Sequence, residues 1–134
     1  MIVVDTNVLA YFFLKSDRTP LAEQALIKDT LWCAPVLWRS EFRNVLALYM
    51  RQEMLTLANA LRIMDEAAGF MQAHEYTVSS MDVLRLVADS ACSADDCAFV
   101  ALAQALGCPL VTDDRKVLRN FPDTAVSLQQ FVDA

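Results

Sequence analysis

Glycine, proline and histidine are scarce in this chain, which has 2 Gly, 4 Pro and 1 His in 134 residues. With so few chain-breaking residues and 56% apolar residues, the composition excludes disorder and indicates a compact, helix-rich protein. No stretch approaches the roughly 18 uninterrupted apolar residues of a membrane span, and the short apolar run at the start has no basic flank. We therefore expect a single soluble domain over residues 1–134, located in the cytoplasm.

The cysteine pattern favours neither a disulfide framework nor a zinc site. Cys33, Cys92, Cys97 and Cys108 include no C-x-x-C pair and lie among apolar neighbours, so we expect reduced thiols in the core. The single histidine, His74, is far from all of them in the sequence and is expected at the surface. The sequence also lacks a recognisable Ser or Cys nucleophile turn and a Gly-rich phosphate loop.

Apolar spacing predicts short strands that alternate with helices. The predicted strands are 2–4, 31–35, 75–80, 108–114 and 124–128. The predicted helices are 6–14, one that begins at Thr19, 36–52, 56–73, 79–91 and 93–107, with a short helical turn before the last strand. Gly107 is expected to close its helix in the C′ position. This order is typical of an α/β fold with a parallel sheet covered by helices on both faces.

Carboxylates follow two of the predicted strands where each strand ends. Asp5 follows the strand at 2–4, and Asp113 and Asp114 follow the run "PLVT". Ligands of parallel sheets gather at the carboxyl ends of strands, so we expect both acidic positions at one edge of the sheet. For each acid taken alone, a second interpretation is equally open, namely that it only caps the next helix.

Glu41 lies on the apolar face of its predicted helix, with Trp38 and Val45 beside it. An unpaired buried carboxylate is costly, and Arg39 and Arg43 do not share this face because they are two positions away. A metal ligand is therefore favoured over a paired structural glutamate.

Asp95 and Asp96 open the helix predicted at 93–107. Ser93 and Asp96 also fit a Ser-x-x-Asp capping pattern, so capping alone would account for the second acid. Neighbouring helical residues point about 100° apart, so we expect only one of the two acids to face a common ion.

The charge balance indicates that these acids form one divalent-metal site. Net charge is −6, but without the six acids at these positions the chain has 11 acidic and 11 basic residues. Carboxylates that converge without a cation repel one another, and Mg²⁺ or Mn²⁺ would relieve the repulsion because both prefer oxygen ligands. Metal-activated water is then the expected nucleophile.

Three blocks of the sequence resemble the PIN domain family and, within it, the VapC-type ribonuclease toxins of prokaryotic toxin–antitoxin pairs. The blocks cover nearly the whole chain and are, in order, "VVDTNVLAYF", "APVLWRSEFRNVL" and "DDCAFVALAQALGCPLVTDDRKVL". The resemblance implies a three-layer α/β/α fold with a central, mostly parallel sheet. It also implies an endoribonuclease that depends on Mg²⁺ or Mn²⁺, has an RNA substrate and a cognate antitoxin, and forms a homodimer, for which we expect the interface at 55–70.

By position, the resemblance assigns metal binding and catalysis to Asp5, Glu41, Asp96 and Asp114. Asn7 and Thr112 are expected as polar support. Asp96 is preferred to Asp95 because the acid of the family lies seven positions before Ala103, whereas many relatives have an aromatic residue in place of Asp95. We expect basic residues at the rim to hold the RNA backbone, although solvated helix faces would explain each of them equally well. The candidates are Arg39, Arg43, Arg51, Arg115, Lys116 and Arg119.

Other functions remain open at this point. A phosphatase with Asp5 as covalent nucleophile would want a second Asp two positions on, where this chain has Asn7. A phospho-acceptor receiver domain would want an acidic pair before the acceptor and a lysine at the end of a later strand, and the sequence has neither. A non-enzymatic alternative is a catalytically weak PIN-like binding module that acts through its antitoxin or another protein partner.

Overall fold

The computed structural model describes residues 1–134. No helix is both long enough and apolar enough to cross a membrane. The elements, in chain order, are β1 (Ile2–Val4), α1 (Thr6–Phe13), α2 (Thr19–Lys28), β2 (Trp32–Pro35), α3 (Trp38–Arg51), α4 (Leu57–Met71), β3 (Glu75–Tyr76), α5 (Ser80–Ala88), α6 (Ala94–Leu106), β4 (Leu110–Val111), α7 (Arg115–Asn120), β5 (Ala125–Val126) and α8 (Leu128–Asp133).

The five strands form one sheet in the order β3-β2-β1-β4-β5, and every pair is parallel. β1 lies at the centre, where Val3 pairs with Cys33 of β2 on one side and with Leu110 of β4 on the other. All residues of β1 and β2 are buried, as expected for strands that are covered on both faces. Burial on both faces explains why these strands are short, continuous apolar runs without polar alternation.

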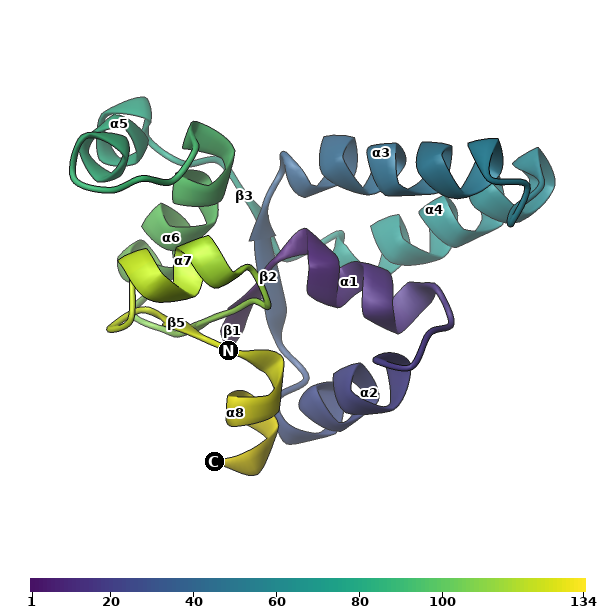
Figure 1. Cartoon of the computed structure of the whole chain (residues 1–134), viewed down its shortest axis with the longest axis horizontal. Helices are drawn as coiled ribbons and strands as arrows, with labels where there is room; N and C mark the ends of the chain where they lie inside the picture. The colour runs from purple at the N-terminus through teal and green to yellow at the C-terminus, as the bar shows by residue number, and fades with distance from the viewer.

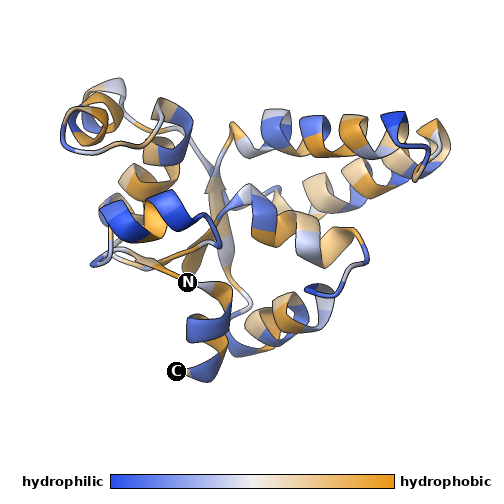
Figure 2. Ribbon diagram, in the orientation of Figure 1, coloured by the Kyte–Doolittle hydropathy of each residue, from blue (hydrophilic) through white to orange (hydrophobic).

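Helices cover both faces of the sheet (Figure 1). α6 packs against β1, β2 and β4, and α5 packs on the outside of α6. Seven consecutive residues of α6, 97–103, are buried, because this helix lies between the sheet and another layer. On the other face α1 packs against α2, α3 and α4. Hydrophobic residues line the strands and α6 (Figure 2). The predicted α/β/α fold is confirmed.

The strand order brings the two acidic strand ends together. Asp5 follows β1 and Asp114 lies three residues beyond β4, and these strands are neighbours in the sheet. The backbone N–H of Asp5 donates to the carbonyl of Val111 at 3.0 Å, which extends the pairing of the two strands to the acid itself.

Some predicted elements differ in length from the observed ones, and the sequence analysis did not predict the last helix, α8. The strand predicted at 75–80 has only two residues, because the side chain of Ser79 instead accepts a hydrogen bond from the N–H of Asp82 and begins α5. The strand predicted at 124–128 likewise ends early, since Ser127 and Gln130 form a capping box that begins α8. The cysteines are free thiols, of which Cys108 alone is only partly buried.

The two glycines of the chain predict opposite effects on stability. Gly107 ends α6 in the left-handed region at φ 66°, whereas Gly69 lies inside α4, and a methyl group would meet nothing within 4 Å at either position. Gly107→Ala should lower the free energy of unfolding by about 1–2 kcal/mol because of backbone strain. Gly69→Ala should raise it by roughly 0.5–1 kcal/mol, since alanine favours a helix interior.

Urea denaturation followed by circular dichroism measures both changes. Effects of the same sign for the two substitutions would contradict this account of the end of α6.

Candidate active site

Asp5 is held by hydrogen bonds from neutral donors at the end of the central strand. Its Oδ1 accepts the N–H of Thr6 at 2.7 Å and so caps α1. Its Oδ2 accepts the hydroxyl of Thr112 at 2.6 Å, and the amide nitrogen of Asn7 lies 3.5 Å away. Thr112 also accepts the N–H of Asp114 at 3.0 Å. One buried threonine therefore fixes the two strand-end acids relative to each other.

Glu41 lies in the first turn of α3 and reaches α1. Its Oε1 accepts the hydroxyl of Thr6 at 2.7 Å, and no cation is bonded to it. Arg39 does not pair with Glu41, as expected; its guanidinium instead forms two hydrogen bonds to Glu75, at 2.6 and 2.8 Å. Arg43 is exposed. Glu41 is thus partly buried with a neutral partner.

The acids at the start of α6 differ in exposure. Ser93 caps the helix by accepting the N–H of Asp96 at 3.1 Å. The side chain of Asp96 is partly buried, whereas Asp95 is exposed. Asp96 is therefore the more enclosed of the two acids, and its assignment to the metal site stays a prediction.

The adjacent acids after β4 have separate roles. Asp114 caps α7, because its Oδ1 accepts the N–H groups of Lys116 and Val117 at 2.9 and 3.1 Å. Asp113 instead forms an ion pair with Arg18 and accepts the N–H of Leu128 at 3.1 Å. Asp113 therefore joins α2 to α8, and only Asp114 stays without a cation.

Burial and mutual repulsion raise the pKa values of these acids. Desolvation raises the pKa of Asp5 to about 6, against the hydrogen bonds from Thr112 and Thr6, and the charges of Asp96 and Asp114 raise it further. Desolvation likewise raises the pKa of Glu41 to about 7, with smaller contributions from Asp5, Asp95 and Asp96. Asp5 is thus influenced by Asp96 and Asp114, and Glu41 by Asp5 and the two acids of α6.

The donor atoms fit a hard divalent cation, although they do not form a complete cage. No three His, Cys, Asp or Glu side chains lie close enough together to ligate one ion directly. Mg²⁺ commonly binds through one or two carboxylates and keeps several waters, so a complete protein cage is not needed. Beside Asp5, the buried Oδ1 of Asn7 has no hydrogen-bond partner, and such an oxygen suits a metal ion or its water.

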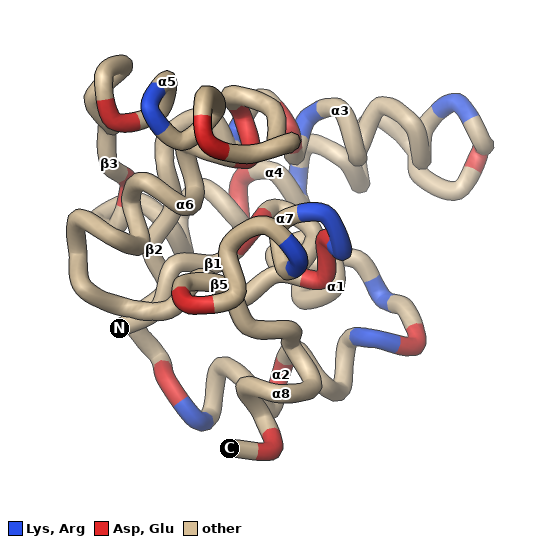
Figure 3. Tube along the Cα trace, turned by 60° about the vertical axis from the view of Figure 1, so that its left-hand side comes forward, with Lys and Arg blue, Asp and Glu red and all other residues tan.

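Basic residues surround this edge of the sheet, but not all of the predicted ones are free (Figure 3). Arg115, Lys116 and Arg119 of α7 are exposed, and α7 begins directly after Asp114. Arg39 pairs with Glu75, so part of its charge is already balanced, and its contact with RNA stays a prediction.

Two functional contacts were missed from the sequence. Thr6 donates to Glu41 across 35 positions, and Arg18 pairs with Asp113 across 95. Neither residue belongs to a local pattern that would have revealed its partner. Only the position of Thr6 directly after Asp5 gave a signal.

Sequence comparison finds one family and a curated relative. The PIN domain profile matches residues 2–123. Ribonuclease VapC3 of Pyrobaculum aerophilum is 28% identical over 124 residues, which are 90% of this chain and 95% of that protein.

Solved structures share the fold. The crystal structure of PAE2754 from Pyrobaculum aerophilum has a TM-score of 0.77 at 19% identity and covers 98% of this chain and 93% of its own. FitAcB from Neisseria gonorrhoeae has a TM-score of 0.76 at 13% identity, with 96% and 99% covered. A toxin–antitoxin complex from Klebsiella pneumoniae has a TM-score of 0.70 at 17% identity, with 96% and 98% covered.

The raised pKa values predict that the metal-free protein loses stability as pH rises. Between about pH 4 and pH 7 the folded chain holds more protons than the unfolded chain, because Asp5 and Glu41 titrate near 6 and 7 instead of 3.8 and 4.5. The free energy of unfolding should therefore fall through this range. The shift at Asp5 alone corresponds to a loss on the order of 3 kcal/mol.

Chemical denaturation in EDTA at several pH values tests this dependence. Glu41→Gln keeps an oxygen that can accept the hydroxyl of Thr6, so the variant should fold and its stability should fall less steeply with pH. Asp65→Asn on the exposed face of α4 makes the same charge change and serves as the control. Stability that rises between pH 5 and pH 7 would contradict the assignment.

Proposed function

Because the chain belongs to the PIN domain family, we propose that it is a metal-dependent endoribonuclease that hydrolyses RNA phosphodiester bonds as the toxin of a toxin–antitoxin pair. The observation that carries this proposal is the group of four acids, Asp5, Glu41, Asp96 and Asp114, none of which contacts a cationic side chain. The name of the curated relative, a ribonuclease, supports the same activity. RNA as substrate agrees with a cytoplasmic place of action.

Mg²⁺ or Mn²⁺, when bound, would supply activation of water and neutralisation of the scissile phosphate. We assign Asp5 and Asp96 as the principal ligands of the ion. Asp5 is held rigidly by Thr6 and Thr112, and Asp96 opens α6 with a partly buried side chain.

Glu41 and Asp114 are suited to orient the attacking water as well as to bind metal. Each uses one carboxylate oxygen for a structural hydrogen bond, Glu41 with Thr6 and Asp114 at the start of α7, and keeps its other oxygen without a protein donor. The bonded oxygen fixes the side chain and leaves the second oxygen available for water or metal. Such pre-organisation reduces the entropy lost when water and phosphate are aligned.

Exposed cations at the rim would hold the RNA backbone. Arg115, Lys116 and Arg119 of α7 lie directly after Asp114, and Arg43 and Arg51 lie along α3. Their contacts with phosphates would make RNA binding fall with salt concentration.

The toxin proposal includes an antitoxin and a second copy of the chain. One structural neighbour is named as a toxin–antitoxin complex, which supports an antitoxin partner here. For the homodimer, the support is an apolar patch formed by Met54, Leu57 and Leu61, whose exposed fractions are 57–62%. Leu57 and Leu61 are one turn apart on α4 and both are exposed, whereas Ala60 and Ile63 of the same helix are buried.

The decisive test of the activity compares the two neighbouring acids of α6. Purified protein should cleave RNA in the presence of Mg²⁺ or Mn²⁺, and EDTA should stop the cleavage. Asp96→Asn should lower the cleavage rate at least about a hundredfold, above the 10- to 100-fold typical of groups that only orient ligands. Asp95→Asn removes the same charge from an exposed position and should keep most of the activity.

Cleavage is measured on structured and single-stranded RNA, with circular dichroism to confirm folding of both variants. Equal cleavage in EDTA would contradict metal dependence, and the reverse ranking of the variants would contradict the register. A folded wild-type protein that binds an antitoxin but cleaves no RNA would instead support the binding-module alternative.

The apolar patch on α4 predicts the oligomeric state. Light scattering of the wild type at micromolar concentration should report a dimer, and the double variant Leu57→Glu, Leu61→Glu should report a monomer because it buries charge in the interface. Leu84→Glu on α5, which is 60% exposed in the wild type, is the control and should remain dimeric. A monomeric wild type would contradict the assignment.

A further inference from the structure

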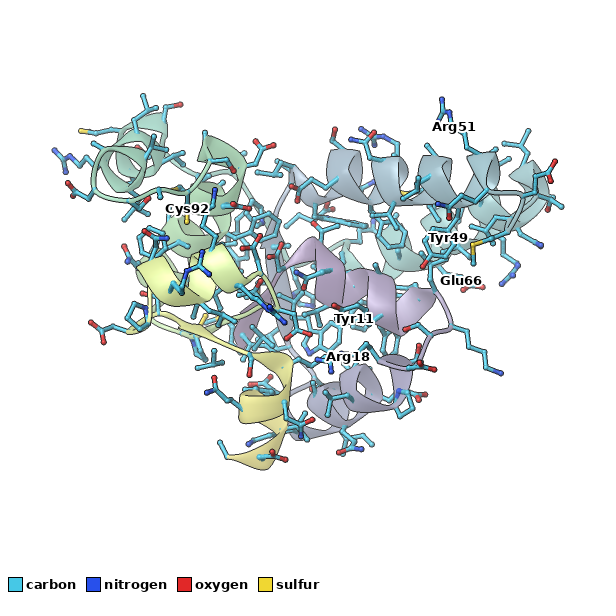
Figure 4. The ribbon with its side chains drawn as sticks, in the orientation of Figure 1. Tyr11, Arg18, Tyr49, Arg51, Glu66 and Cys92 are labelled. Carbon is cyan, nitrogen blue, oxygen red and sulfur yellow. The ribbon has the colours of Figure 1, made fainter.

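A pocket of about 400 Å³ opens beside the candidate active site, between α1, the segment that leads to α2, and α3. Its walls include Asn7, Tyr11, Arg18, Val45 and Tyr49. In Figure 4, Tyr11 and Arg18 lie together beside α1, and Tyr49 lies between α3 and α1. The volume is within the range of about 300–1,000 Å³ of pockets that bind small organic groups.

The chemistry of the walls suits a flat, aromatic ligand. The guanidinium carbon of Arg18 lies over the Tyr11 ring, 5.6 Å from its centre, so the cation covers one face of the ring and the two side chains form one wall of the pocket. Tyr49 supplies a second ring from α3, and the apolar side chain of Val45 adjoins it. Proteins bind unpaired nucleobases by stacking them on aromatic rings and on guanidinium planes.

Arg18 is fixed in this position and not available as a free cation. Its guanidinium pairs with Asp113, which also accepts the N–H of Leu128. The ion pair offsets the charge of Arg18, so the residue offers the pocket a planar surface more than a net positive charge. A planar base fits this wall better than a second phosphate does.

The pocket adjoins the group of carboxylates through Asn7. Asn7 lines the pocket, and its amide nitrogen lies 3.5 Å from Oδ2 of Asp5. Arg18, which also lines the pocket, pairs with Asp113, the residue that precedes Asp114. A base in the pocket would therefore belong to a nucleotide next to the phosphate at the acids.

We propose that the pocket between Tyr11, Arg18 and Tyr49 binds an unpaired nucleobase that flanks the scissile phosphate of the RNA. This inference rests on the proposed nuclease function and adds the requirement that the flanking base be unstacked.

The first experiment measures nucleotide binding without turnover. The full-length protein is titrated with AMP, GMP, CMP and UMP and followed by NMR, and the largest shifts should occur in α1 and α3. Tyr49→Leu keeps apolar bulk but removes the ring, and it should weaken binding of the preferred nucleotide about tenfold or more. Tyr49→Phe should bind like the wild type, as should Leu48→Ala, which alters the exposed neighbour on α3.

The second experiment places the base relative to the cleaved bond. An oligoribonucleotide that the protein cleaves is synthesised again in a series of versions, each lacking the base at one position. Removal of one particular base next to the cleaved bond should slow cleavage by the wild type but not by Tyr49→Leu. If no RNA is cleaved, the proposed function fails, whereas the nucleotide titration still tests the pocket. Equal nucleotide binding by Tyr49→Leu and the wild type would overturn the inference. The inference would also be overturned if Tyr49→Leu weakened only the complex with a co-expressed antitoxin and left nucleotide binding unchanged. The pocket would then be a protein-docking site.

Discussion

The desolvated carboxylate of Asp5, at the end of the central strand, is the constraint on which the rest of the site depends. β1 has a neighbour on each side, so its end lies in the middle of the sheet edge, where water access is poor. One oxygen of Asp5 caps α1 and the other accepts the hydroxyl of Thr112, which in turn fixes Asp114. Thr6, the first residue of α1, then holds Glu41. The chain thus positions three acids through two threonines.

Burial of these acids in their charged form lowers the free energy of unfolding, and nothing in the packing of the fold requires it. The donors that hold Asp5 and Glu41, namely two threonine hydroxyls and one backbone N–H, are neutral and do not cancel the charge, so burial raises the pKa values of both acids. The large apolar core offsets this loss of stability. Seven consecutive residues of α6 are buried, and β1 and β2 are buried completely. Destabilised groups of this kind concentrate at functional sites.

Local patterns made most of the fold predictable, whereas distant pairs did not. Short apolar strands, the apolar face around Glu41 and the glycine after α6 are visible in the sequence, because each depends on neighbours a few positions away. The capping box of Ser127 and Gln130 was also visible but was read as the end of a strand. By contrast, the pairing of Arg39 with Glu75 crosses 36 positions and depends on the alignment of β2 with β3. No local spacing encodes that alignment.

The distribution of arginines explains why the acids remain uncompensated. Arg18 and Arg39 come from elements next to the site, and either could in principle have neutralised one of its carboxylates. Each is instead bound by an acid outside the group, Arg18 by Asp113 and Arg39 by Glu75. The remaining cations of α7 and α3 are exposed at the rim, where solvent weakens their effect on buried groups. The charge of the four acids can therefore be balanced only by protons or by a cation from solution, and near neutral pH the protons of Asp5 and Glu41 are already being lost. A site with these properties suits a divalent ion, which is what the proposed nuclease function requires.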